Sequence, residues 1–167
     1  RTEDVAGGKL TNLGEQLNEL QVHPTLGKML LLASLFQCTD PMLTVCAALG
    51  YKSPFLCPLG REREANEAKL RLSNGSSSDH IALANAYDGF RRNGRDFTSR
   101  YFLSHTTMDY MHRLRCDLEQ AARGMLQSAD ATHHNHIESH DLVDVCRAVL
   151  VAGLWPNLAW IKRRGKG

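Results

Sequence analysis

Histidines crowd a short polar segment near the end of the sequence, and closely spaced imidazoles can ligate a metal ion. They are His133, His134, His136 and His140. Imidazole nitrogens bind zinc or nickel, and Glu138 or Asp141 could complete such a site. The surrounding segment, 128–140, is polar and offers little apolar packing to hold ligands in place. We therefore predict a solvated surface loop over 128–140 and no metal site.

Motifs that hold phosphates or activate a nucleophile are missing from the sequence. It lacks G-x-x-x-x-G-K-[ST], a helix-opening G-x-G-x-x-G and G-x-S-x-G. Gly7-Gly8-Lys9 does not have the spacing of a phosphate-binding loop, and Asp109 and His112 have no nucleophile beside them. We therefore predict no catalytic residue, and the chain by itself is not expected to be an enzyme.

A proline-containing connector, residues 50–60, carries a stronger signal for binding. It presents an aromatic ring, a cation and a hydroxyl group in succession, at Tyr51, Lys52 and Ser53. Arg61 and Arg63 follow at the start of a charged helix. Cations and hydroxyl groups beside a helix N-terminus suit the phosphates and sugars of a nucleic-acid backbone. The alternative is a plain connector whose Phe55 and Leu56 pack inward while the charges are solvated.

The elements that must position these residues are predicted to be helices, because apolar residues recur at three- and four-residue spacing. The predicted helices span 13–20, 26–36, 41–49, 61–72, 79–92, 106–127 and 142–153. Asp40 is predicted to cap one helix, Ser77 or Ser78 another, and Asn93-Gly94 is predicted to form a turn. We predict an all-α fold, a bundle of seven or eight helices after a short irregular N-terminal segment.

The longest predicted helix, 106–127, also carries arginines. Its apolar stripe consists of Met108, Met111, Leu114, Leu118, Ala121 and Met125. Arg115 borders this stripe, so its side chain could reach a groove. Arg113 and Arg123 are expected to face solvent.

Composition indicates one folded domain of modest charge. The chain has 167 residues, 43% of them apolar, and a formal net charge of +2, which excludes a binder whose affinity is wholly electrostatic. Five cysteines without C-x-x-C spacing favour a reducing compartment over a disulfide framework. The longest apolar run, 29–36, falls far short of the ~20 residues of a membrane span. The sequence begins without Met or a signal core, which is typical of a piece of a larger protein.

Several segments in order and in register resemble the DEAH/RHA-type ATP-dependent RNA helicases. The first are Leu10-Thr-Asn-Leu-Gly14 and Pro24-Thr-Leu-Gly-Lys-Met29. The others are Asp40-Pro-Met-Leu-Thr44, Ser53-Pro-Phe55, Ser78-Asp-His-Ile-Ala-Leu83, Asn85-Ala-Tyr-Asp-Gly89, Tyr101-Phe-Leu-Ser104 and Ala152-Gly-Leu-Trp-Pro156. The match runs over residues 10–160 and looks most like the RNA helicase A subgroup.

The resemblance implies a helicase-associated (HA2) region. Residues 1–23 would end a winged-helix domain, 24–161 would form the ratchet-like helical bundle, and 162–167 would be a basic tail. In this family two RecA-like domains hydrolyse nucleotide, and the ratchet and an OB-fold domain close a channel over single-stranded RNA. The chain would then be a non-catalytic module that couples RecA-domain motion to RNA translocation. ATP and Mg²⁺ would belong to RecA-like domains of the parent protein, with no cofactor or metal in this chain.

The resemblance also bears on which residues meet RNA. In splicing relatives a Ser and an Asn after the third helix contact RNA, and Gly50 and Ser53 stand at these positions. Together with the charge pattern, this predicts sequence-independent contacts to the RNA backbone. The predicted contact residues are Lys52, Ser53, Arg61, Arg63 and Arg115.

Two other functions stay open at this point. A helical docking domain could bind helicase partners or activators through helix 61–72 and the basic tail. A metal-dependent enzyme would rest on the histidine segment. The expected location is an intracellular reducing compartment, whether nucleus, cytoplasm or organelle, with no membrane partner.

Overall fold

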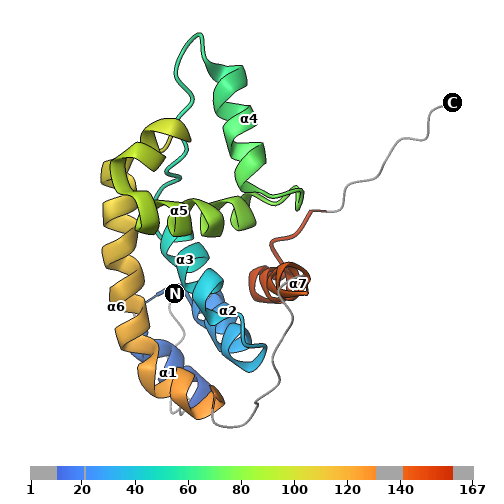
Figure 1. The fold of residues 1–167 in the computed structure, drawn as a ribbon. Coiled ribbons are helices and arrows are strands. Elements are labelled where there is room, and N and C mark those ends of the chain that lie inside the picture. The colour runs from blue at the N-terminus through green and yellow to red at the C-terminus, as the bar shows by residue number, and fades with distance from the viewer. Residues whose placement is uncertain (1–10, 21, 131–140, 160–167) are drawn as a thin grey trace, which may run out of the picture.

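The chain folds as a bundle of α-helices (Figure 1). The computed structural model describes residues 11–20, 22–130 and 141–159, which contain seven helices. They are α1 (Asn12–Glu19), α2 (Pro24–Leu35), α3 (Thr39–Leu49), α4 (Glu62–Leu72), α5 (Asp79–Arg100), α6 (His105–Asp130) and α7 (Leu142–Leu154). Within these described ranges, the β pairing is limited to an isolated bridge between Phe55 and Leu103. The predicted all-α class is confirmed, while the predicted irregular segment at the N-terminus lies outside the described residues.

Helix starts follow the predicted capping chemistry at one position and depart from it at another. Ser78 Oγ accepts a hydrogen bond from the Ile81 N–H at 3.4 Å, which confirms one of the two serine caps. The cap predicted at Asp40 is wrong, because α3 already begins at Thr39 after the N-cap residue Cys38. Asp40 instead lies in the first turn of α3, where the helix dipole still stabilises a carboxylate. From this position its side chain can form an ion pair with a residue of another helix.

Two predicted boundaries also differ from the structure. Gly94 has φ 54° and ψ −126°, so the predicted turn is a kink, but helical hydrogen bonding resumes after it and α5 continues to Arg100. Glycine tolerates this backbone conformation, which other residues adopt at a cost. α6 extends to Asp130, into the predicted loop 128–140, and the four histidines of that loop lie outside the described residues.

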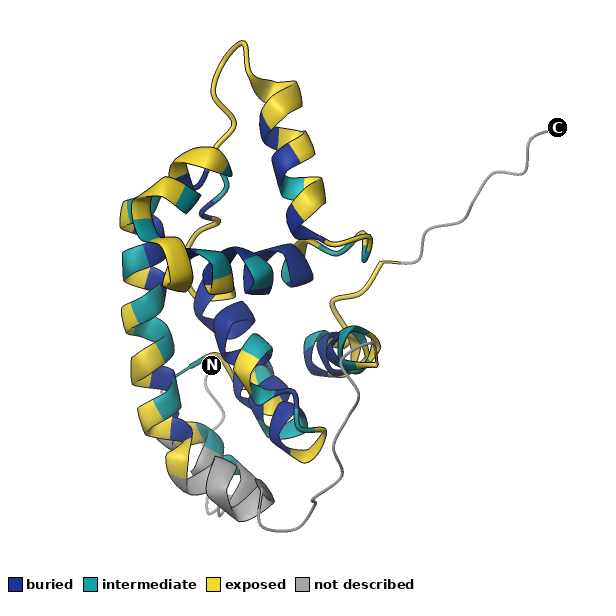
Figure 2. Ribbon diagram, viewed as in Figure 1, coloured by how far each residue is buried: buried dark blue, intermediate teal, exposed yellow. Residues whose placement is uncertain are grey.

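The helices enclose two apolar clusters. One joins α2 and α3 to α6 and α7, and its fully buried members include Met29, Leu30, Met42 and Val149. The other gathers side chains of α4 and α5 and of the start of α6, among them Tyr87, Phe90, Met108 and Met111. Figure 2 shows this burial concentrated where α2, α3 and α5 meet, while α4 is largely exposed. Ala121, predicted inside, is exposed, and its neighbour Ala122 is buried in its place.

The connector 50–60 is attached to the segment that precedes α6. The Leu56 N–H donates to the Phe102 carbonyl at 2.8 Å, and the Ser104 N–H donates to the Pro54 carbonyl at 2.9 Å. Phe55 packs against the second apolar cluster, as the plain-connector alternative predicts, but Leu56 is exposed. The connector thus has a fixed path from α3 to α4.

Among the described residues, no helix combines the length and the apolar character that a membrane crossing requires.

We predict that Gly153→Ala destabilises the fold. An added methyl group would lie 2.7 Å from Met29 Cβ and 3.2 Å from Met29 Cα, so α7 must move away from α2. Overpacking costs ~1–3 kcal/mol and alanine regains about 1 kcal/mol of helix propensity, so we expect a net loss of up to about 2 kcal/mol in the free energy of unfolding.

Urea denaturation measures this loss, and Gly50→Ala is the matched control. Gly50 has φ −76°, and its added methyl group would meet a backbone oxygen at 3.4 Å, an ordinary contact. Equal losses in the two variants would contradict close packing of α2 and α7 as the cause.

Candidate nucleic-acid interface

Lys52 and Ser53 lie on the exposed first half of the connector 50–60. The Lys52 ammonium group stands 5.3 Å from the centre of the Tyr51 ring, and none of the ion pairs in the described part of the chain involves it. Ser53 Oγ accepts a weak hydrogen bond from the Phe55 N–H at 3.4 Å, which leaves the hydroxyl proton able to donate to a ligand. Both side chains are therefore accessible to an anionic partner.

Arg61 and Arg63 flank the start of α4, and each already has a carboxylate partner. Arg61 Nη2 lies 2.6 Å from Glu64 Oε2, and Arg63 Nε lies 2.9 Å from Glu67 Oε1. The hydrogen bond from Arg61 lowers the pKa of Glu64, and the same bond raises the pKa of Arg61. Solvent screens such exposed pairs, so a phosphate group can compete for either guanidinium.

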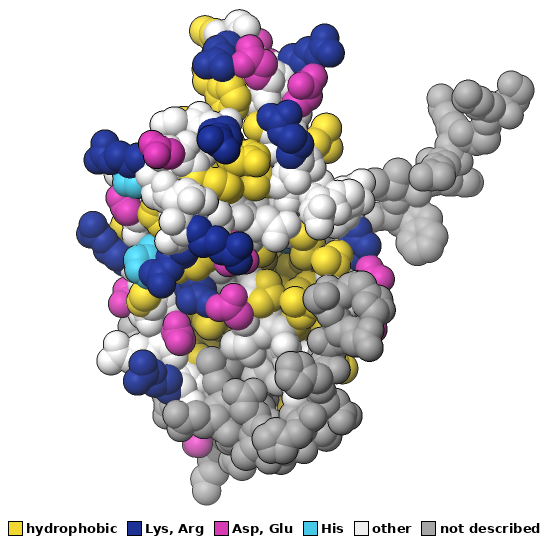
Figure 3. All heavy atoms as spheres, in the orientation of Figure 1, with side chains coloured by type: hydrophobic (Ala, Val, Ile, Leu, Met, Phe, Trp, Pro, Cys, Tyr) yellow, Lys and Arg dark blue, Asp and Glu magenta, His cyan; other side chains and the backbone are white. Residues whose placement is uncertain are grey.

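Lys52 and Ser53 lie on the connector, and Arg61 follows its end as the N-cap residue of α4. The Arg61 guanidinium lies 4.6 Å from the centre of the Phe102 ring, and the Phe102 carbonyl is the group that holds Leu56. Arg63 follows on the first turn of α4. Figure 3 shows basic and acidic side chains interleaved over the face in view, in keeping with a net charge near zero.

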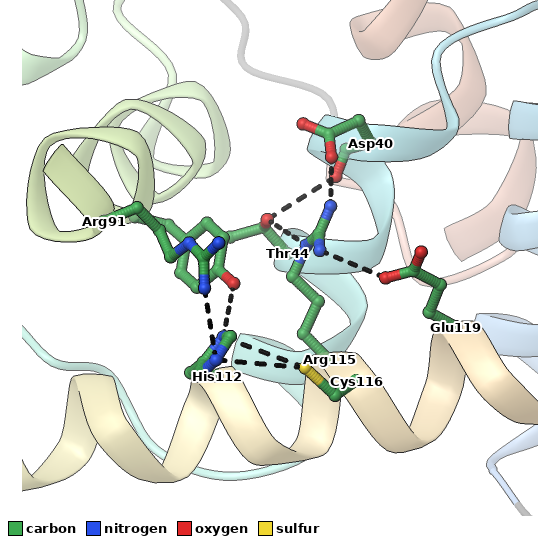
Figure 4. Close-up of polar contacts among 8 residues, drawn as sticks. Asp40, Thr44, Arg91, His112, Arg115, Cys116 and Glu119 are labelled. Carbon is green, nitrogen blue, oxygen red and sulfur yellow. Dashed lines mark hydrogen bonds and ion pairs between the residues drawn. The ribbon is translucent and has the colours of Figure 1, made fainter.

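Arg115 lies apart from the connector, at the junction of α3, α5 and α6 (Figure 4). Its side chain is 12% exposed and forms ion pairs with Asp40 and with Glu119. Nε donates to Thr44 Oγ1 at 3.2 Å, and the guanidinium lies 5.2 Å from the centre of the Tyr87 ring. Arg115 therefore links three helices and is not grouped with Lys52.

A polar cavity of about 490 Å³ borders the Arg115 junction. Its charged lining consists of Arg91, Arg92, Arg115, Asp40, Asp88 and Glu119. Three positive and three negative side chains balance one another. The cavity therefore lacks the excess of positive charge that an anion-binding pocket needs.

His112 connects the same cavity to α5. Arg91 Nη1 lies 3.2 Å from His112 Nε2, and a guanidinium can only donate, so Nε2 accepts and Nδ1 carries the proton. That proton points to the Tyr87 hydroxyl oxygen, 2.7 Å from Nδ1. Burial, followed by the charges of Arg91 and Arg115, lowers the pKa of His112 and favours this neutral ring.

Tyr110 is a neighbour of the connector that carried no signal in the sequence. Its ring centre lies 4.3 Å from that of Tyr51, and Arg113 is exposed one turn farther along α6. Tyr110 and Arg115 point about 140° apart around the helix axis, because they are five residues apart. Tyr110 lies off the apolar stripe of α6, and only the tertiary fold places it beside Tyr51.

An apolar cavity of about 870 Å³ adjoins this region. It is lined by α2, α3, α6 and α7 and by the segment between α1 and α2, and its lining includes Leu49, Gly50 and Leu114.

Comparisons with known proteins identify similar chains. Residues 23–83 match the family described as helicase associated domain (HA2), ratchet-like. DExH-box ATP-dependent RNA helicase DExH1 of Arabidopsis thaliana is 43% identical over 165 residues, which cover 95% of this chain and 16% of that protein. ATP-dependent DNA/RNA helicase DHX36 of Homo sapiens is 35% identical over 163 residues, which cover 92% of this chain and 16% of that protein. Putative ATP-dependent RNA helicase DHX57 of Mus musculus is 33% identical over 180 residues, which cover 92% of this chain and 13% of that protein. The chain thus spans 16% or less of these relatives.

We predict that Arg115→Ala lowers the free energy of unfolding by about 1–3 kcal/mol, because hydrogen bonds to charged groups contribute on this scale. The variant removes the contacts to Asp40, Thr44 and Glu119 at once. Chemical denaturation checks the loss. Arg113→Ala is the control on the same helix, and an equal effect there would argue against a role of Arg115 in joining the helices.

The pKa of His112 also predicts a pH dependence of stability. Its pKa is lowered in the folded chain from an unfolded value near ~6.5, so the unfolded state binds the proton more tightly. The stability contribution of neutral His112 is complete above the unfolded pKa and decreases as the pH falls through it. We expect His112→Gln to flatten the change in unfolding midpoint between about pH 7.5 and pH 5.5, a window that spans the unfolded pKa. Parallel pH profiles of the two proteins would contradict this assignment.

Proposed function

This chain belongs to the helicase-associated (HA2), ratchet-like family as it occurs in DExH-box RNA helicases, and we propose that it forms one wall of a channel over single-stranded RNA. In this proposal it also transmits the movement of RecA-like motor domains to the strand. The chain has no G-x-x-x-x-G-K-[ST] motif, so ATP and Mg²⁺ bind to those motor domains and not to this module. An OB-fold domain closes the channel on the other side.

The accessible connector is the observation that supports this role. Lys52 lacks an ion pair with the described carboxylates, and Ser53 keeps a hydroxyl proton to donate. Both are held on a path fixed by backbone hydrogen bonds to the segment before α6. A fixed cation and hydroxyl group suit phosphate and sugar contacts, which position a strand without reading its sequence.

The arginines divide into two roles. Arg61 and Arg63 can exchange exposed carboxylates for phosphates, so they extend the contact surface onto α4. Arg115 is held by two carboxylates and a hydroxyl group at the helix junction, and it serves the module by fixing α3 and α5 against α6. The module can transmit a movement of the motor domains only if its helices keep their positions relative to one another.

A docking role for α4 is the second candidate function. Leu59 is 96% exposed ahead of α4, and Leu70 is 64% exposed on the helix itself. Exposed leucines among charged residues suit a contact with a protein partner such as a helicase activator.

We predict that Lys52→Glu with Arg61→Glu, in the full-length helicase, weakens RNA binding and reduces unwinding per ATP hydrolysed. Each phosphate contact on a single strand contributes about 0.7 to the slope of log K against log salt. Loss of two such contacts should therefore make the slope shallower by about 1.4. Binding titrations over a series of salt concentrations measure the slope, and unwinding and ATPase assays measure the coupling.

Arg71→Glu with Arg123→Glu is the matched control, since it makes the same change in net charge. Arg71 lies about 15 Å beyond Arg61 along α4, and Arg123 about 20 Å beyond Tyr110 along α6. Unchanged affinity and salt slope in the Lys52 and Arg61 variant would refute the channel wall. Loss of activation by a protein partner, with RNA binding intact, would support the docking role.

A further inference from the structure

Tyr51 and Tyr110 place two aromatic rings side by side at the surface. Tyr51 comes from the connector and Tyr110 from α6, and their ring centres are 4.3 Å apart with planes tilted by 43°. Tyr51 is 46% exposed and Tyr110 is 43% exposed. Each ring is therefore supported by the other and still presents much of its surface to solvent.

Two cations, Lys52 and Arg113, lie near this pair. The Lys52 ammonium group stands 5.3 Å from the centre of the Tyr51 ring. Arg113 lies three residues beyond Tyr110 on α6 and so projects from the same side of the helix. Arg113, like Lys52, forms no ion pair with a carboxylate in the described part of the chain.

Acidic residues also lie near the pair, on α6. Asp109, next to Tyr110, lies 3.5 Å from the imidazole of His105, which offsets its charge only when that ring is protonated. Asp117 lies two turns beyond Tyr110 on α6, about 10 Å along the axis. Lys52 and Arg113 are the cations near the rings that have no carboxylate partner in the described part of the chain.

We propose that Tyr51 and Tyr110 form a platform on which a base of single-stranded RNA stacks, while Lys52 and Arg113 contact the flanking phosphates. This inference rests on the proposed channel wall and names the residues that would meet bases in it. Every base has an aromatic face, so stacking tolerates any sequence and agrees with backbone contacts that read none. Exposed rings with cations nearby suit a strand that alternates bases with phosphates better than they suit an apolar peptide.

The test uses the full-length helicase and two oligomers of equal length, oligouridylate RNA and the corresponding abasic ribose-phosphate strand. We expect Tyr51→Ala with Tyr110→Ala to weaken oligouridylate binding at least about fivefold, which corresponds to ~1 kcal/mol for one stacked base. Binding of the abasic strand should not change. Tyr51→Phe with Tyr110→Phe should retain the wild-type affinity for both, because the rings remain.

Two results would overturn the platform: an equal loss of affinity for both strands, or no loss for oligouridylate.

Thermal unfolding midpoints of the alanine and phenylalanine variants show whether the fold is kept. Ultraviolet cross-linking of wild-type protein to oligouridylate provides a second readout. A strand stacked on the platform cross-links at Tyr51 or Tyr110, and cross-links confined to other residues would count against it.

The Lys52→Glu and Arg61→Glu variant separates this inference from the proposed function. It should weaken binding of both strands, because the phosphates are common to them. If it does so while the tyrosine variant loses affinity for neither, the channel wall stands and the platform is wrong. If the charge variant changes neither, the channel wall itself is wrong.

Discussion

Two backbone hydrogen bonds between the connector 50–60 and the segment before α6 hold the candidate interface in place. The prolines of the connector cannot donate an N–H and would interrupt a continuous helix, so without these bonds the connector would have many conformations to lose on binding. Pro54 and Leu103 are buried where the two segments meet, so burial of these side chains adds to the two bonds. The positions of Tyr51 beside α6 and of α4 at the far end of the connector both depend on this attachment.

Burial decides what each cation can do. Arg115 is nearly enclosed, and an enclosed charge is costly unless carboxylates or hydrogen-bond acceptors compensate it, which Asp40, Thr44 and Glu119 do. Lys52 is exposed and has no such requirement. The two residues look equivalent as charges in a sequence, but one completes a helix junction and the other remains able to meet a partner.

Local rules predicted those parts of the fold that local interactions control. The first part of the α6 stripe and the Ser78 cap follow from contacts within a few residues, and both are present in the structure, with Met108, Met111 and Leu118 buried. The rules failed where tertiary contacts or a change of backbone path intervened. Asp40 has capping chemistry but pairs with a distant arginine from the first turn of α3, and α5 resumes its hydrogen bonding after Gly94 because its second part packs Phe97 against the apolar cluster.

The sequence by itself determined the helical class, the approximate helix limits and the family resemblance, because periodicity, caps and motifs are properties of neighbouring residues. It also located Lys52, Ser53, Arg61 and Arg63 around one connector. Only the tertiary structure decided that Arg115 is compensated at a junction and that Tyr110 lies against Tyr51. Such pairings join residues far apart in the chain, and they arise when helices pack, so no pattern of local spacing encodes them.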